Sequence, residues 1–186
     1  CVLAGEITSK AKVDFEKVAR RVIHEVGYTH DDIGFNDKTC EVLVRLHSQS
    51  PDIAMGVDDN AEKGKDVGAG DQGLMFGYAC NQTEELMPFP IAYAHRLINR
   101  LAEVRLKGGI KWLRPDSKSQ VTVEYDGSKP VRVEAVVIST QHDPSADQKQ
   151  IEADLKKELL PAVLSGYKMA SDCKIYINPS GKFVVG

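Results

Sequence analysis

Three glycines within six residues, Gly68-Ala69-Gly70-Asp71-Gln72-Gly73, constrain this chain of 186 residues more than any other stretch. Glycine lacks a Cβ, so the backbone here can adopt positive φ angles or let a ligand approach closely. Residues 58–66 before it are charged and carry no apolar pattern, whereas residues 74–80 after it are continuously apolar. We therefore predict a mobile charged loop, a tight turn and a buried strand, an arrangement suited to a ligand site. An ordinary turn between two elements is the alternative.

The composition is that of an ordinary globular protein. Hydrophobic residues make up 42% of the chain and charged residues 27%, which is enough apolar material for a core. The formal net charge is −3, so the chain offers no field that would attract nucleic acid or an anionic membrane. No run approaches the roughly 20 apolar residues of a membrane span. We expect neither a nucleic-acid nor a membrane partner.

Cysteine usage and the chain ends suggest where the protein works. The four cysteines are far apart and form no C-x-x-C pair; they are Cys1, Cys40, Cys80 and Cys173. This pattern favours free thiols in a reducing cytoplasm over a zinc site or a disulfide framework. The chain starts inside an apolar run without Met or a signal-peptide pattern. We expect a cytoplasmic protein, of which this chain is a piece.

Apolar spacing predicts three amphipathic helices, over residues 14–28, 91–107 and 146–160. Asp14 is expected to cap the first helix and Gly27 to end it. Asp143 or Ser145 is expected to cap the third, and Pro161 to end or kink it.

Strands are expected over residues 1–7, 40–46, 74–80, 121–125, 131–140 and 174–178. Asp126-Gly127 has the chemistry of a hairpin turn between two of them. The order of the elements predicts the α+β class. We expect repeated strand-helix-strand-strand units, with mostly antiparallel sheets and helices on one face.

Polar residues at the ends of these elements are candidates for binding. Glu6 ends the first strand and Gln49 follows the second; a solvated strand end is the simpler interpretation of each. Asp116 and Lys118 are two residues apart on an extended segment, so their side chains point to the same face. They either bind a nucleotide or pair with each other. Residues 180–183 offer a hydroxyl, a cation and an aromatic ring, which suits a purine and its phosphates. An ordinary connecting turn is the alternative.

Familiar nucleotide and hydrolase motifs are absent from the sequence, including the P-loop, G-x-G-x-x-G, H-E-x-x-H and G-x-S-x-G. Instead, Gly68–Ala79 and six further blocks follow one another in a recognisable order. These blocks are Gly5–Thr8, Gln49–Ile53, Tyr93–Leu97, Trp112–Thr122, Ser139–His142 and Asn178–Phe183. Together they resemble the S-adenosylmethionine synthetases (methionine adenosyltransferases) over essentially the whole chain.

The resemblance implies an enzyme that transfers the adenosyl group of ATP to the sulfur of L-methionine and releases phosphate and diphosphate. It also implies Mg²⁺ and K⁺ as cofactors, and a homodimer or a dimer of dimers with active sites between subunits. By the same resemblance, residues 1–56 are the remainder of an N-terminal domain. Residues 57–67 are a mobile gating loop and residues 68–186 a central domain.

The resemblance also implies roles for individual residues. Three are expected to bind methionine: Glu6, Gln49 and Asp71. Eight are expected to bind ATP: Asp71, Asp116, Ser117, Lys118, Ser180, Gly181, Lys182 and Phe183. Lys118 is the expected catalytic residue, since it would stabilise phosphate charge. No metal ligand is assigned within this chain.

Two departures from the family pattern matter. Lys182 stands where the family more often has arginine; lysine keeps the charge but loses the planar fork. The family's His-Pro-Asp-Lys segment, its potassium-site acid and its later phosphate-binding lysines are not in this sequence. We therefore expect these 186 residues alone to be inactive. The competing interpretation is a non-catalytic nucleotide-binding or regulatory paralogue; a weaker one is another phosphate-ester transferase that uses the glycine turn.

Overall fold

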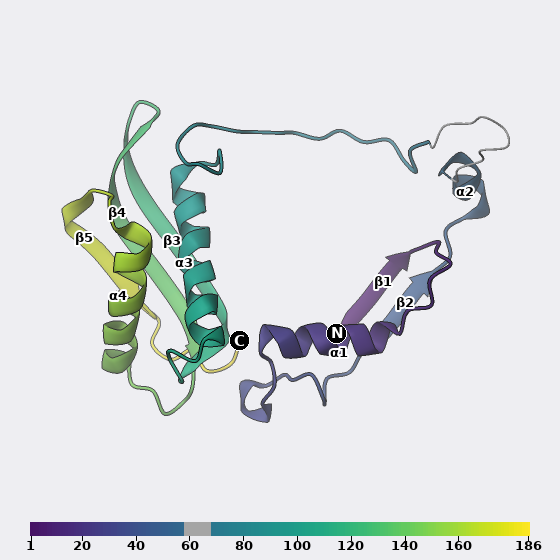
Figure 1. The fold of residues 1–186 in the computed structure, drawn as a ribbon, viewed down its shortest axis with the longest axis horizontal. Helices are drawn as coiled ribbons and strands as arrows, with labels where there is room; N and C mark the ends of the chain where they lie inside the picture. Colours follow the sequence, from purple (N-terminus) through teal and green to yellow (C-terminus); the bar gives the residue numbers. More distant parts are fainter. Residues whose placement is uncertain (58–67) are drawn as a thin grey trace. The chain divides into compact units, whose positions relative to one another are not determined.

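The computed structural model describes residues 1–57 and 68–186 and divides the chain into two compact units, whose elements are labelled in Figure 1. Unit 1 comprises residues 1–29 and 35–77; unit 2 comprises residues 30–34 and 78–186. Residues 58–67, which include most of the predicted gating loop, lie outside the described residues.

Unit 1 contains a parallel pair of strands joined through a helix. β1 (Val2–Glu6) pairs with β2 (Leu43–His47) in a register that sets Glu6 opposite His47. Between them lies α1 (Phe15–Val26), whose first turn is capped by the Asp14 carboxylate, 3.0 Å from the Lys17 amide. Gly27 ends the helix with a φ of 107°, a left-handed conformation that glycine adopts without strain. The predicted cap and stop of this helix are confirmed.

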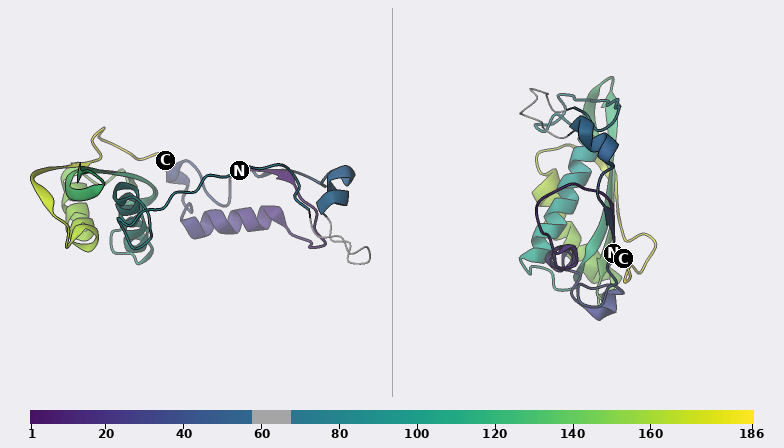
Figure 2. Two further views of the ribbon diagram at one scale, coloured as in Figure 1. Left: turned by 90° about the horizontal axis from the view of Figure 1, so that it is seen from above. Right: turned by 90° about the vertical axis from the view of Figure 1, so that its right-hand side faces the viewer.

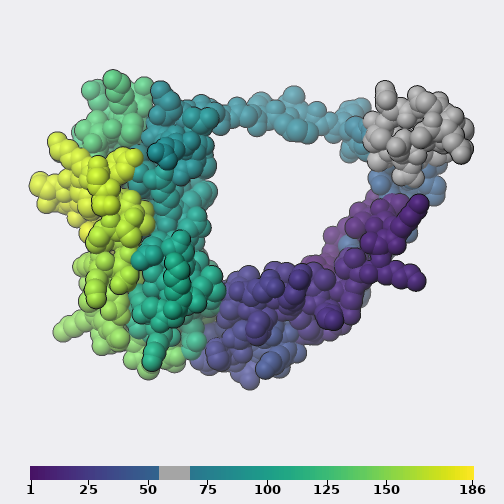
Figure 3. Space-filling model, viewed as in Figure 1, coloured from purple at the N-terminus to yellow at the C-terminus, as the bar shows by residue number. Residues whose placement is uncertain are grey.

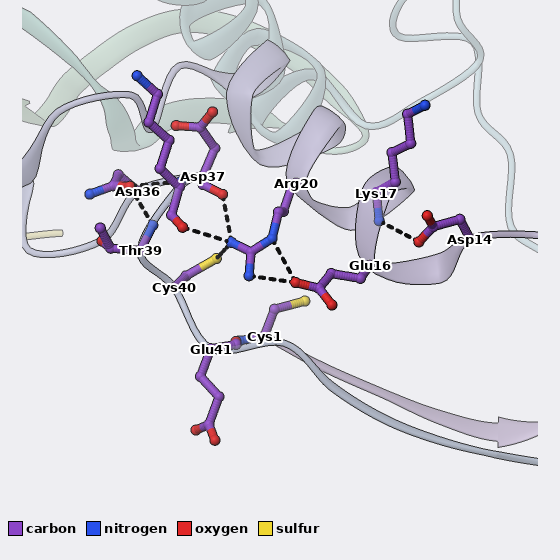
Figure 4. A network of polar contacts seen from close by, with 11 residues as sticks. Cys1, Asp14, Glu16, Lys17, Arg20, Asn36, Asp37, Thr39, Cys40 and Glu41 are labelled. Atoms are coloured by element: carbon purple, nitrogen blue, oxygen red, sulfur yellow. Dashed lines mark hydrogen bonds and ion pairs between the residues drawn. The ribbon is translucent and has the colours of Figure 1, made fainter.

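A network around Arg20 attaches α1 to the loop that precedes β2 (Figure 4). The Arg20 guanidinium donates to the main-chain oxygens of Asp37, at 2.8 Å, and Lys38, at 3.1 Å. It also pairs with Glu16 at 2.7 Å, one helical turn earlier. One side chain thus supplies donors to carbonyls that the irregular loop would otherwise leave without a partner.

Two segments, one in unit 1 and one at the junction of the two units in sequence, differ from the prediction. α2 (Pro51–Val57) occupies the start of the stretch expected to be a loop; proline at a first helical position is already set at a helical φ. No strand forms over residues 74–80, where Leu74, Met75 and Phe76 expose 82%, 89% and 94% of their surface. A strand needs a neighbour for its backbone groups, and no described strand pairs with this segment.

Unit 2 is built on a three-stranded sheet in the order β3-β4-β5. The elements are η1 (Asp31–Ile33), α3 (Phe89–Leu106), β3 (Leu113–Asp126), β4 (Lys129–His142), α4 (Gln148–Leu164) and β5 (Met169–Ile177). β3 and β4 form an antiparallel hairpin that turns at Gly127, and β5 joins β4 in parallel. Figure 2 shows α3 and α4 on one face of this sheet.

The α+β class is confirmed, with its helices on one face of the sheet of unit 2. The pairing is more parallel than predicted, because β1–β2 and β4–β5 are both parallel and only β3–β4 is antiparallel. Each parallel pair is connected through a helix that carries the chain back to the same end of the sheet. The repeated unit is therefore strand-helix-strand.

The core of unit 2 lies between the sheet and its two helices. Fully buried side chains come from each layer, including Leu97 of α3, Val136 and Ile138 of β4, and Leu155 and Leu159 of α4. Burying one such side chain stabilises the fold by roughly 1.5–3 kcal/mol. In the space-filling view, α3 and α4 lie side by side (Figure 3).

α4 begins and ends later than predicted. Its cap is Asp147, whose carboxylate accepts from the amides of Lys149, at 2.8 Å, and Gln150, at 3.0 Å. Pro161 does not end the helix, which continues to Leu164. Proline removes one backbone hydrogen bond, but Leu159 and Leu164 are both buried and fix the helix on either side of it.

Two sequence-level expectations can be compared with the described residues. All four cysteines are present in them as free thiols. Among the helices described, none has the length and apolar character required to cross a membrane.

Candidate nucleotide-binding site

The residues expected to bind ATP in unit 2 come from two places that the sheet brings together. Asp116, Ser117 and Lys118 lie on β3, and residues 180–183 belong to the terminal turn, which we define as residues 178–183 after β5. The Lys118 ammonium lies 5.0 Å from the centre of the Phe183 ring, within cation–π range. A cation and an aromatic face thus form one surface, although they are 65 positions apart in the sequence.

Asn178 starts the terminal turn and fixes it to β4. Its φ is 44°, and a left-handed conformation is easier for asparagine than for most residues. Its side-chain oxygen accepts from the Thr140 amide at 2.8 Å, and its side-chain nitrogen donates to the Thr140 carbonyl at 3.1 Å. The side chain thereby continues the β4–β5 pairing by one position beyond Ile177. Asn178 and Thr140 are both buried.

His142, at the end of β4, contacts the last part of the terminal turn. Its main-chain amide donates to the Phe183 carbonyl at 2.9 Å. The Phe183 amide in turn lies 3.1 Å from Nε2 of the His142 ring, and Nδ1 of the same ring lies 2.9 Å from the Asp143 carbonyl. Both main-chain polar groups of Phe183 are therefore bound by this one histidine.

Gln141 links the two halves of the candidate site. Its side-chain nitrogen donates to the Val184 carbonyl at 2.9 Å, and its side-chain oxygen accepts from the Asp116 amide at 3.3 Å. The side chain is fully buried, so water does not compete for these bonds. The backbone that carries Asp116 is thus tied to the segment that follows Phe183.

These three anchoring residues had no role in the sequence interpretation, where Gln141, His142 and Asn178 counted only as parts of the family blocks. What distinguishes them in the sequence is that they are polar residues at the end of an apolar strand, the strand that carries the inward-facing Val136 and Ile138 or the one paired with it. Because buried polar groups are almost always hydrogen-bonded, such residues indicate a long-range partner.

A charged group lies beside the site. The Arg114 guanidinium pairs with Asp143 at 2.7 Å and with Asp32 at 3.1 Å. Hydrogen bonds from the Ser145 hydroxyl and amide, at 2.6 and 2.9 Å, lower the pKa of Asp143 below its ordinary value, and Arg114 adds to this. In the described part of the chain no ion pair joins Asp116 to Lys118, so the interpretation that they only pair with each other is not supported.

The residues expected to bind methionine lie in unit 1. Glu6 ends β1 opposite His47, and Gln49 follows two residues after β2 ends. The carboxyl ends of parallel strands meet at one edge, which is where ligands commonly bind. A cavity of about 280 Å³ opens beside them. Its lining is mixed apolar and polar: Ile7, Ser9, Ala11, Val13, Phe15, Leu46, His47 and Ser48.

Asp71 lies in an exposed stretch of unit 1. Its carboxylate accepts from the Gln72 amide at 2.7 Å, which is local turn chemistry. A role for Asp71 in binding stays a prediction.

The described residues supply no metal centre: within residues 1–57 and 68–186, no group of three or more His, Cys, Asp or Glu side chains could hold an ion. The donor sets that Mg²⁺ prefers are clusters of carboxylates and other oxygen ligands.

The fold and the candidate site define an α+β protein in which a basic and an aromatic side chain meet beside the sheet. The sequence model of the N-terminal domain of S-adenosylmethionine synthetase matches residues 1–51, and that of the central domain matches residues 66–183. The chain is 52% identical, over 189 residues, to the S-adenosylmethionine synthase of Clostridium acetobutylicum. That alignment covers 98% of this chain and 48% of the relative. The chain therefore belongs to the S-adenosylmethionine synthetase family and spans about half the length of the curated relative it matches.

Proposed function

We propose that the protein containing this chain transfers the adenosyl group of ATP to the sulfur of L-methionine and releases phosphate and diphosphate. Membership of the family supports the reaction. The observation that carries the proposal within this chain is the Lys118 ammonium 5.0 Å from the centre of the Phe183 ring, which lies on a turn anchored by hydrogen bonds from Asn178 and His142.

This surface suits the nucleotide half of the reaction. The methionine sulfur attacks C5′ of ATP, the C5′–O bond breaks, and the triphosphate leaves with its negative charge. Water then hydrolyses the triphosphate to phosphate and diphosphate. Lys118 supplies a positive charge at the phosphates, where stabilisation lowers the barrier. Phe183 offers an aromatic face to the adenine ring, and Ser180, Gly181 and Lys182 border that face. Asp116 and Ser117 contact the nucleotide from β3.

The edge of unit 1 suits the methionine half. Glu6 and Gln49 provide a carboxylate and an amide for the polar end of the amino acid, and we assign Asp71 to its amino group. The neighbouring cavity is lined in part by Ile7, Val13, Phe15 and Leu46, which match a thioether chain in polarity. No covalent nucleophile is required, because positioning and charge stabilisation provide the catalysis.

The wider assembly is also part of the proposal. Mg²⁺ and K⁺ would neutralise phosphate charge, with ligands outside this chain.

We propose a cytoplasmic homodimer or dimer of dimers. On β5, Cys173, Ile175 and Ile177 pack toward the core, so that Tyr176, 45% exposed, lies on the opposite face of the sheet. This face is the proposed contact. Residues 1–56 and 68–186 are proposed to be the N-terminal and central domain portions.

The test is an assay of the full-length protein with ATP, L-methionine, Mg²⁺ and K⁺. We expect S-adenosylmethionine to form, and Lys118→Met to reduce kcat by about 10²-fold or more. Lys118→Arg, which keeps the charge, serves as the matched control. A protein that binds ATP but forms no product would be a non-catalytic paralogue, contrary to the proposal. The 186-residue chain alone is expected to form no product.

A further inference from the structure

We propose that His142 is a positioning residue of the nucleotide site. In this proposal a neutral imidazole with its proton on Nδ1 holds Phe183 by the main chain and so sets the place of the aromatic ring. The inference rests on the proposed function, because it assumes that ATP binds against Phe183 and Lys118.

The two ring contacts of His142 specify its protonation state. The Asp143 carbonyl, 2.9 Å from Nδ1, can only accept a hydrogen bond, so Nδ1 must carry a proton. The Phe183 amide, 3.1 Å from Nε2, can only donate, so Nε2 must be unprotonated. Of the three forms of an imidazole, only the neutral Nδ1–H tautomer satisfies both contacts.

The burial of His142 makes a change of its protonation state costly. His142 is 3% exposed and Phe183 is partly buried, so water has limited access to the contact between them. If Nε2 ceased to accept, the Phe183 amide would lose its acceptor, and leaving a partly buried donor unsatisfied is costly. The imidazolium or the Nε2–H tautomer would instead set one donor against another. The ring of His142 therefore favours a single position of the Phe183 backbone.

The surrounding bonds confine the expected effect to the position of Phe183. The main-chain bond from His142 to the Phe183 carbonyl survives any substitution of the side chain. Gln141 continues to hold Val184, and Asn178 continues to hold the start of the terminal turn. Loss of the imidazole should thus displace the aromatic ring relative to Lys118 without unfolding the sheet.

A pair of substitutions in the full-length enzyme tests the role. The side-chain oxygen of glutamine can replace Nε2 as acceptor, whereas leucine has a similar volume and no acceptor. We expect His142→Leu to raise KM for ATP about tenfold and His142→Gln to stay within about threefold of the unsubstituted enzyme. KM for methionine should change by less than about twofold in both variants. Circular dichroism melts establish that each variant is folded.

A spectroscopic measurement needs no variant. In the ¹⁵N-histidine-labelled enzyme, the chemical shifts of the two ring nitrogens distinguish Nδ1–H from Nε2–H and from the imidazolium; we expect Nδ1–H for His142 at neutral pH. The inference is wrong if another form is found there, or if the Leu and Gln variants have the same KM for ATP. An unsubstituted enzyme that does not bind ATP would instead refute the proposed function, whatever the tautomer.

Discussion

Substituting Asn178 tests whether the terminal turn is fixed by its side chain. Asn178→Ala removes both hydrogen bonds to Thr140 and leaves two buried backbone groups unsatisfied, at about 1–3 kcal/mol each. Alanine also pays about 1 kcal/mol for the left-handed conformation that the turn requires at a φ of 44°. Together these terms destabilise the end of the sheet by roughly 3–7 kcal/mol.

The assay is hydrogen–deuterium exchange of the Thr140 amide, which donates to Asn178 in the native fold. When exchange is limited by opening of the structure, a loss of about 3 kcal/mol accelerates it roughly hundredfold. Peptides covering residues 138–142 should show this change, while peptides from the middle of α3 should not. The comparison within one sample separates local loosening from global unfolding.

Asn178→Gly is the matched control, because it deletes the same bonds without the left-handed strain. It should exchange faster than the unsubstituted protein but about fivefold slower than the alanine variant, which corresponds to roughly 1 kcal/mol. The reasoning is refuted if the glycine variant exchanges at the original rate, since the backbone conformation alone would then matter. It is equally refuted if Asn178→Ala changes the Thr140 exchange rate less than about fivefold.

Three further perturbations address the site and its charges. Phe183→Leu should raise KM for ATP about three- to tenfold, through loss of aromatic stacking, and an unchanged KM in steady-state kinetics would exclude that contact. Lys182→Arg should tighten ATP binding several-fold in calorimetric titrations, because guanidinium engages phosphate bidentately; weaker or equal binding would argue against a phosphate contact. The depressed pKa of Asp143 adds stability that is complete above the ordinary value of about 3.9 and is lost as the pH falls through the lower folded value. Asp143→Asn should therefore flatten the acid limb of thermal melts recorded against pH, and an unaltered limb would assign that limb to other carboxylates.

The sequence correctly predicts those helix ends that depend only on the adjacent residues. Asp14 and Gly27 bound α1 in the structure as the sequence predicts, since a cap and a stop act only on the adjacent turn. The strand expected over residues 74–80 is absent, because strand formation depends on a partner that the local apolar pattern does not reveal. Of the two outcomes predicted for Pro161, an end of the helix does not occur: α4 continues to Leu164, and burial of Leu159 and Leu164 on either side offsets the bond that proline removes.

In the candidate site, too, some features could be predicted from the sequence and others required the fold. The candidate residues at the strand exits and on β3 could be found from their places at the ends of predicted strands, and the family resemblance assigned their roles. The meeting of Lys118 with Phe183 required the sheet order β3-β4-β5, which periodicity does not specify. The roles of Gln141, His142 and Asn178 depend on partners 38 to 43 residues away, and no short motif encodes such a distance.

Unit 2 is discontinuous in sequence, and this affects how the protein can be dissected. Asp32, from the short η1 turn, supplies one of the two carboxylates on Arg114, and the neighbouring Ile33 is buried. A gene fragment that begins at residue 78 would omit both, although it would contain every strand of the sheet. Expression trials of a central domain should therefore supply residues 30–34 as well, for example by fusing that segment through a linker.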